Sequence, residues 1–148
     1  MPGQERDALL QAAAAFVEHD FLEHAQTVMK QFPQDVTEQG ALYIQAILAA
    51  NLEKDPNKAL SFLRKVPQDA PNYPSVLLFQ IHVLTEKKDW QQAGAICRKG
   101  KELYPENPMF PLVLADLYTK TNESDKALTT LLKAEKKWPG QRDRKSVV

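Results

Sequence analysis

Three histidines and one cysteine are the residues whose chemistry could support a metal site or a catalytic nucleophile. Two of the histidines belong to the sequence His19-x-x-x-Glu23-His24, one residue longer than the His-x-x-Glu-His zinc motif. A turn is predicted between His19 and Glu23, so we interpret these side chains as ordinary surface residues. Cys97 is the only cysteine, which excludes an intramolecular disulfide and a cysteine metal cluster. A nucleophilic thiol needs an activating base and partial exposure, and Cys97, next to Ile96, is better interpreted as a core thiol. The sequence therefore predicts no catalytic residue, no metal site and no cofactor, and we expect that the protein is not an enzyme.

The charged residues balance overall but are unevenly placed. The formal net charge is zero, so the whole protein has no general attraction to nucleic acid or to an anionic membrane. Residues 1–74 hold 6 Lys and Arg against 10 Asp and Glu, whereas residues 75–148 hold 13 against 9. This asymmetry could favour head-to-tail contact or an oriented partner, or it could be chance on solvated helix faces.

The basic residues near the end of the chain are Lys133, Lys136, Lys137, Arg142, Arg144 and Lys145. Among them Trp138 is the one aromatic residue on which a base could stack. No glycine-rich phosphate loop occurs in the sequence. We therefore predict no nucleic-acid partner.

The bulk properties of the chain are those of an ordinary globular domain. The apolar fraction is 43% and the charged fraction 26%, and 148 residues are enough for one domain with a continuous core. No apolar run approaches about 18 residues, so no membrane insertion is predicted. The first five residues lack the apolar stretch of a secretory signal. We expect a cytoplasmic protein, with a periplasmic location as the alternative if a signal segment has been removed.

The spacing of apolar residues predicts pairs of helices along the whole chain. In the first helix Leu9, Ala13 and Phe16 follow the spacing of one helical face. A second helix follows a short polar turn and ends at Pro33, because proline cannot continue a helix. Similar pairs begin near residues 40, 74 and 108. In the turn of the second pair Asp55 is expected to cap the following helix, and Pro56 suits its first position.

Small residues recur at a fixed period in the second helix of each pair. Ala25, Ala59, Ala93 and Ala127 are equally spaced, and the tripeptide Pro-Gln-Asp at residues 33–35 recurs with the same spacing at residues 67–69. Where two helices cross, a small residue lets their axes approach to about 8–10 Å. The alanines are therefore predicted to lie at the crossings.

This arrangement resembles the tetratricopeptide repeat (TPR), a helix–turn–helix unit of about 34 residues. The last copy keeps Leu114, Tyr118, Ala127 and Pro139 of the family pattern, with Ala115 in place of glycine and Leu131 in place of the aromatic residue. It departs from the pattern at Pro111, which stands in place of a tryptophan. The resemblance implies an all-α fold, an α-solenoid of four TPR-like repeats in a right-handed superhelix. The repeats would span residues 6–39, 40–73, 74–107 and 108–140 of a single domain, with an N-terminal extension at 1–5 and a disordered basic tail at 141–148.

The resemblance also implies a scaffold or adaptor for protein–protein interaction. In this family the first helices of the repeats line a concave groove that takes a peptide or an amphipathic helix of a partner. Leu10, Ile44, Leu78 and Leu112 recur on those helices with the period of the alanines. The complete predicted groove consists of Leu10, Ala14, Val17, Ile44, Gln45, Leu48, Asn51, Leu78, His82, Leu112 and Asp116. The alternative is that some of these leucines are core residues, and a narrower version of the function is a secretion or assembly chaperone.

A second function class is structural self-association. Repeat arrays usually need a polar capping helix, and few residues follow Pro139. The side chains that would then lie partly bare are Val113, Leu117, Leu128, Leu132 and Trp138. Either the chain forms a homodimer through its C-terminal repeat, or it is a fragment of a larger assembly.

Overall fold

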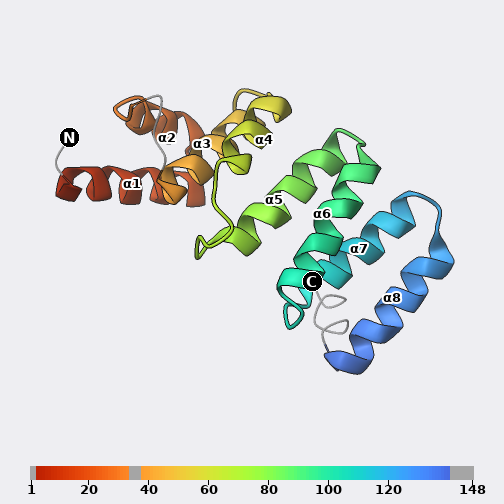
Figure 1. The fold of residues 1–148 in the computed structure, drawn as a ribbon. Helices are drawn as coiled ribbons and strands as arrows, with labels where there is room; N and C mark the ends of the chain where they lie inside the picture. Colours follow the sequence, from red (N-terminus) through yellow and green to blue (C-terminus); the bar gives the residue numbers. More distant parts are fainter. Residues whose placement is uncertain (1–2, 34–37, 141–148) are drawn as a thin grey trace. The chain divides into compact units, whose positions relative to one another are not determined.

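The computed structural model of the chain describes residues 3–33 and 38–140. Within these ranges it consists of eight helices and contains no strand (Figure 1). The helices in chain order are α1 (Gly3–Glu18), α2 (Leu22–Met29), α3 (Gln39–Asn51), α4 (Pro56–Arg64), α5 (Tyr73–Glu86), α6 (Trp90–Leu103), α7 (Met109–Lys120) and α8 (Ser124–Lys137). The predicted all-α class is confirmed. The tail predicted at residues 141–148 lies outside the described residues.

The first helix begins earlier than the sequence indicated. α1 starts at Gly3, so residues 3–5 of the predicted extension are helical. Glu5 lies in its first turn, where a carboxylate is favoured by the partial positive charge of a helix N-terminus. In the described part of the chain, no helix combines the length and the apolar character needed to cross a membrane.

The alanines that recur once in each helix pair are buried. Ala25, Ala59 and Ala93 are 0% exposed, and Ala127 is 5% exposed. They lie on α2, α4, α6 and α8, and α2, α4 and α8 pack on α1, α3 and α7 respectively. A residue at the crossing of two helices must be buried, so this burial agrees with the predicted crossing positions.

The turn inside each helix pair also contains a residue with a left-handed backbone. These residues are Asp20, Lys54, Lys88 and Asn122, with φ between 57° and 62°, and they share the period of the alanines. In the third pair the Lys88 amide donates to the Thr85 carbonyl and the Asp89 amide donates to the Leu84 carbonyl, both at 2.9 Å. These two bonds satisfy carbonyl groups that the end of a helix leaves free. The left-handed residue therefore ends the first helix and reverses the chain.

Two of the second helices begin with an aspartate cap. The Asp55 Oδ1 atom accepts a hydrogen bond from the Lys58 amide at 3.1 Å, and Pro56 is the first residue of α4. Both predictions for this turn are confirmed. Asp89 caps α6 in the same way through the Gln92 amide, at 3.2 Å. Such a cap stabilises a helix by about 1 kcal/mol.

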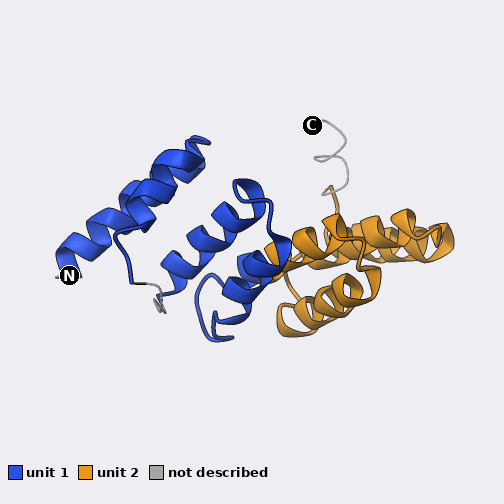
Figure 2. Cartoon of the chain, turned by 90° about the horizontal axis from the view of Figure 1, so that it is seen from above, with its two compact units in different colours: residues 1–76 blue, residues 77–148 orange. Residues whose placement is uncertain are grey.

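The chain divides into two compact units, residues 1–76 and residues 77–148, with the boundary inside α5 (Figure 2). In unit 1, α1, α2 and α3 pack on one another and α4 packs on α3. The Arg6 guanidinium forms an ion pair with Glu38, with Nε and Oε2 2.8 Å apart, and lies 5.7 Å from the centre of the Phe32 ring. This contact ties α1 to the start of α3.

Unit 2 contains a tight contact between α6 and α7. The Phe110 side chain of α7 is fully buried, and its ring lies against the backbone of α6 at Gly100. A Cβ atom at Gly100 would overlap with this ring. Tyr104, just after α6, stacks on Phe110, with the two ring centres 6.0 Å apart. Glycine is therefore required at position 100 by close approach.

We expect Gly100→Ala to destabilise the protein by about 1–3 kcal/mol. The added methyl group would overlap the buried Phe110 ring, which has no space to move into. The matched control on the same helix is Gly94→Ala, whose Cβ would meet only the flexible end of the Arg98 side chain, at 3.5 Å. There the usual helix preference for alanine predicts a gain of about 0.5–1 kcal/mol. Denaturant unfolding followed by circular dichroism measures both changes. Equal stability of the two variants would contradict the contact.

Candidate functional site

The predicted groove residues of unit 1 divide between the core and the surface. Those packed in the cluster that α1, α2 and α3 form are Leu10, Val17, Ile44 and Leu48. Ile44 and Leu48 are buried, whereas Leu10 and Val17 are half-buried. Ala14 and Asn51 are exposed and Gln45 is half-buried. In this unit the apolar row therefore contributes mainly to the core.

The predicted groove residues of unit 2 are more accessible. Leu78 on α5 and Leu112 on α7 are half-buried, and His82 and Asp116, one turn further on, are exposed. The His82 ring lies 6.0 Å from the Phe79 ring. Asp116 forms an ion pair with Lys120 at 3.1 Å. Both leucines thus retain a surface that another molecule could contact.

The end of unit 2 carries exposed apolar residues. Leu128 and Leu132, one turn apart on α8, are 53% and 55% exposed. Val113 and Trp138 are half-buried. Leu117 is buried, because α7 packs on both α6 and α8. The bare surface at this end is therefore formed by α8.

The His24 ring packs against aromatic neighbours, and Cys97 lies in the core. The His24 ring lies 5.3 Å from the Phe16 ring and 5.8 Å from the Phe21 ring. Among residues 3–33 and 38–140, no group of three or more His, Cys, Asp or Glu side chains could hold a metal ion. Cys97 is fully buried. Burial raises the pKa of its thiol to about 12, although the charges of Arg98 and Lys101 act in the opposite direction.

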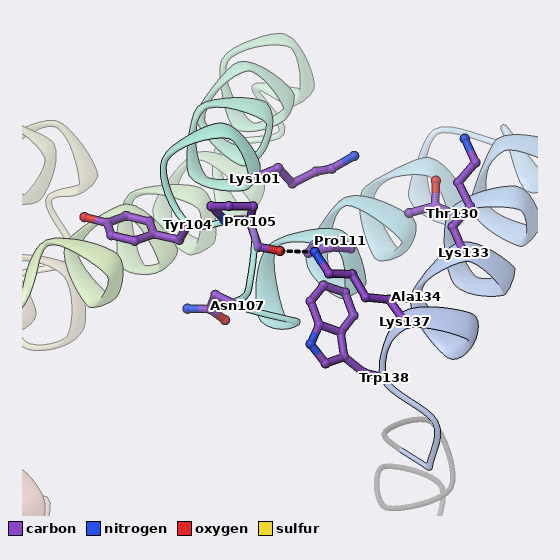
Figure 3. A pocket seen from close by; sticks show the side chains of 10 residues that line it. All are labelled: Lys101, Tyr104, Pro105, Asn107, Pro111, Thr130, Lys133, Ala134, Lys137 and Trp138. Carbon is purple, nitrogen blue, oxygen red and sulfur yellow. Dashed lines mark hydrogen bonds between the residues drawn. The ribbon is translucent and has the colours of Figure 1, made fainter.

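Unit 2 also contains a pocket that sequence reasoning missed (Figure 3). Its volume is about 310 Å³. We call it the basic pocket, and its lining residues are Lys101, Tyr104, Pro105, Asn107, Pro111, Thr130, Lys133, Ala134, Lys137 and Trp138. They come from the end of α6, the α6–α7 connection, the start of α7 and the second half of α8.

The wall formed by the α6–α7 connection is held by hydrogen bonds. The Tyr104 amide donates to the Gly100 carbonyl at 2.8 Å, and the Asn107 amide donates to the Tyr104 carbonyl at 3.0 Å. The Asn107 Oδ1 atom accepts from the Met109 amide at 2.9 Å, next to the start of α7. The stacking of Tyr104 on Phe110 connects this wall to the core. The α6–α7 connection is thus held to the end of α6 and to the start of α7.

The three lysines of the basic pocket are in different situations. Lys137 extends across from α8, and its Nζ atom donates to the Pro105 carbonyl at 2.6 Å (Figure 3). It also pairs with Glu106 at 3.2 Å and lies 4.7 Å from the centre of the Trp138 ring. Lys101 and Lys133 make no ion pair or hydrogen bond with any side chain in the part of the chain that the structure describes. Lys137 is structural, whereas no described side chain neutralises the charge of the other two lysines.

No protein-family model and no curated protein matches this sequence. Solved structures match in fold. A crystal structure of MamA aligns with a TM-score of 0.76 and 17% identity, covering 96% of this chain and 81% of the MamA chain. MamA residues 41 to the end from Desulfovibrio magneticus align with a TM-score of 0.74 and 18% identity, covering 94% and 78%. PilF of Pseudomonas aeruginosa aligns with a TM-score of 0.74 and 20% identity, covering 93% and 63%. The similarity covers nearly the whole chain and shows that it has the TPR-like helical-repeat fold.

We expect Cys97 to resist thiol reagents in the folded protein. The thiolate is the reactive form, and a pKa of about 12 leaves the buried thiol protonated at neutral and mildly alkaline pH. In the unfolded chain the pKa returns to about 8.5 and the thiol becomes accessible. Labelling with a thiol–disulfide exchange reagent, with and without denaturant, measures the difference. Native labelling as fast as that of the denatured chain would contradict the burial.

Proposed function

We propose that this protein is a non-catalytic protein-interaction module that binds a peptide or an amphipathic helix of another protein. The stacked helices of repeat proteins provide extended surfaces of this kind. The helical-repeat fold supports the proposal, and the proposed binding surface is that of the first helices in unit 2, α5 from residue 77 onward and α7.

The observation that carries the proposal is a leucine that recurs at one position of the first helix and stays accessible in unit 2. Leu78 and Leu112 occupy this position in successive repeats, and both are half-buried. Beside them, one turn on, lie the exposed polar residues His82 and Asp116. A surface of this composition would bind chiefly by burying apolar area, worth about 25 cal/mol per Å² before the cost of ordering. The polar neighbours would set the orientation of the bound segment.

The test is a peptide-display selection on the purified wild-type chain, followed by binding measurements with two double variants. We expect selected peptides to lose about tenfold or more in affinity for Leu78→Glu/Leu112→Glu, because a charge placed at each contact must be desolvated on binding. The matched control is Phe21→Glu/Met109→Glu, which changes two exposed apolar residues outside the predicted groove. Circular dichroism checks that helicity is retained. Failure to enrich any peptide, or equal binding by both variants, would overturn the proposal.

Self-association is the second candidate, favoured by the exposure of Leu128 and Leu132 on α8. Two leucines contribute only part of the surface that a stable dimer buries, about 800 Å² on each partner. The proposed homodimer through the C-terminal repeat would therefore be weak and concentration-dependent.

We expect sedimentation analysis to show dimers of the wild-type chain at high concentration, returning to monomers on dilution. The variant Leu128→Glu/Leu132→Glu should stay monomeric with the same melting temperature, since both side chains are more than half exposed. A wild-type chain that is monomeric at every concentration would remove this candidate.

A further inference from the structure

We propose that the basic pocket of unit 2 binds an acidic segment of a partner protein that carries an aromatic side chain among its carboxylates. The inference rests on the proposed role in protein interaction. It does not depend on Leu78 and Leu112, which do not line this pocket.

The charge of the pocket selects an anionic partner. Three lysines line it, and none of the lining residues within the described ranges is an Asp or Glu. The carboxylate of Glu106, nearby in the α6–α7 connection, pairs with Lys137. The charges of Lys101 and Lys133 are left without a partner among the described residues. They come from α6 and α8, so a bound segment would lie between cations of two different helices (Figure 3).

Two of the three lysines have a structural role at a helix end, and the third does not. Lys101 lies in the last turn of α6 and Lys137 in the last turn of α8. A cation at these positions offsets the partial negative charge of a helix C-terminus. Lys133 lies one turn before the end of α8, outside that region. Its charge has no such structural role, which makes it the strongest candidate for contact with a carboxylate.

The apolar walls select an aromatic or similar side chain. Trp138 and Tyr104 contribute aromatic surface, and Pro105 and Pro111 contribute rigid apolar surface. Tyr104, Pro111 and Trp138 are half-buried, so the rings are held in place while part of each remains accessible. A volume of about 310 Å³ is at the small end of the range for ligand pockets. It suits one large side chain and its flanking backbone.

A larger hollow in unit 1 also combines lysines with aromatic side chains, Phe32 and Phe62, but a carboxylate is part of its lining. It measures about 570 Å³ and is also lined by three lysines, Lys30, Lys58 and Lys65. There, however, Glu53 lines the hollow and pairs with Lys58 at 2.8 Å. Lys65 lies 5.6 Å from the centre of the Phe62 ring. Part of the positive charge of this hollow is therefore already neutralised by a carboxylate of the protein itself.

The probe for the test is a short fluorescein-labelled peptide with one phenylalanine flanked on both sides by glutamates. Fluorescence anisotropy measures its binding to the full chain. We expect the variant Lys101→Gln/Lys133→Gln to lose about tenfold or more in affinity, because each neutralised lysine removes a charged hydrogen bond. Binding to the wild-type chain should also weaken as salt is added.

Matched controls separate the pocket from general charge and from the proposed groove. Lys30→Gln/Lys136→Gln removes the same number of charges away from the basic pocket and should change affinity by less than about twofold. The neutral pair Leu78→Gln/Leu112→Gln, which adds no charge beside the lining residue Pro111, should bind the acidic probe normally, so failure of the groove leaves this result intact. Replacing the glutamates of the probe by glutamines, or its phenylalanine by alanine, should weaken binding in each case.

Three results would overturn the proposal. The first is no binding of the acidic probe, or equal binding by the Lys101→Gln/Lys133→Gln variant while its melting temperature is unchanged. The second is equal binding of the glutamine probe, which would make the contact purely apolar. The third is displacement of the probe by inorganic phosphate together with preferential binding of a phosphoserine peptide, which would assign the pocket to phosphorylated partners.

Discussion

This structure depends on the close approach of helices, which small residues such as alanine make possible. Ala25, Ala59, Ala93 and Ala127 lose nearly all contact with solvent, yet each methyl group buries little apolar area. Their contribution is therefore mainly geometric, since they set how near the second helix of a pair lies to its neighbours. The larger fully buried side chains, such as Leu63 and Ile81, supply most of the stabilisation once that distance is set.

The repeat could be predicted from the sequence because its features depend on local residue types at a fixed period. The alanines, the Asp55 cap and Pro56 at a helix start each have a direct structural reason. The left-handed residues of the turns could not be predicted in the same way. Lysine at positions 54 and 88 has no preference for positive φ, and it adopts this backbone because the helices on both sides impose it. The period of the repeat holds for these turn residues although their types differ.

The period of the repeat also identifies equivalent positions on the first helices. It does not predict how exposed the side chain at each position is. Ile44 and Leu78 occupy the same position in successive repeats, yet Ile44 is buried and Leu78 is half-buried. The burial of Ile44 comes from α1 and α2, which pack on α3 within unit 1. Sequence spacing carries no information on such neighbours. The basic pocket was missed for a related reason, because its lining residues come from four segments and none of those segments has a motif of its own.

The basic pocket and the core of unit 2 share one set of contacts. Gly100 has no side chain, and this lets the Phe110 ring lie against α6. The buried Phe110 ring then supports the stacked Tyr104 ring, which forms part of the pocket wall. The Tyr104 amide also donates to the Gly100 carbonyl, which holds the start of the connection to the end of α6. Lys137 closes the other side by binding Pro105 and Glu106. A pocket supported in this way is already formed before a ligand arrives, so binding would not have to order its walls, and less of the contact energy would be lost to conformational entropy.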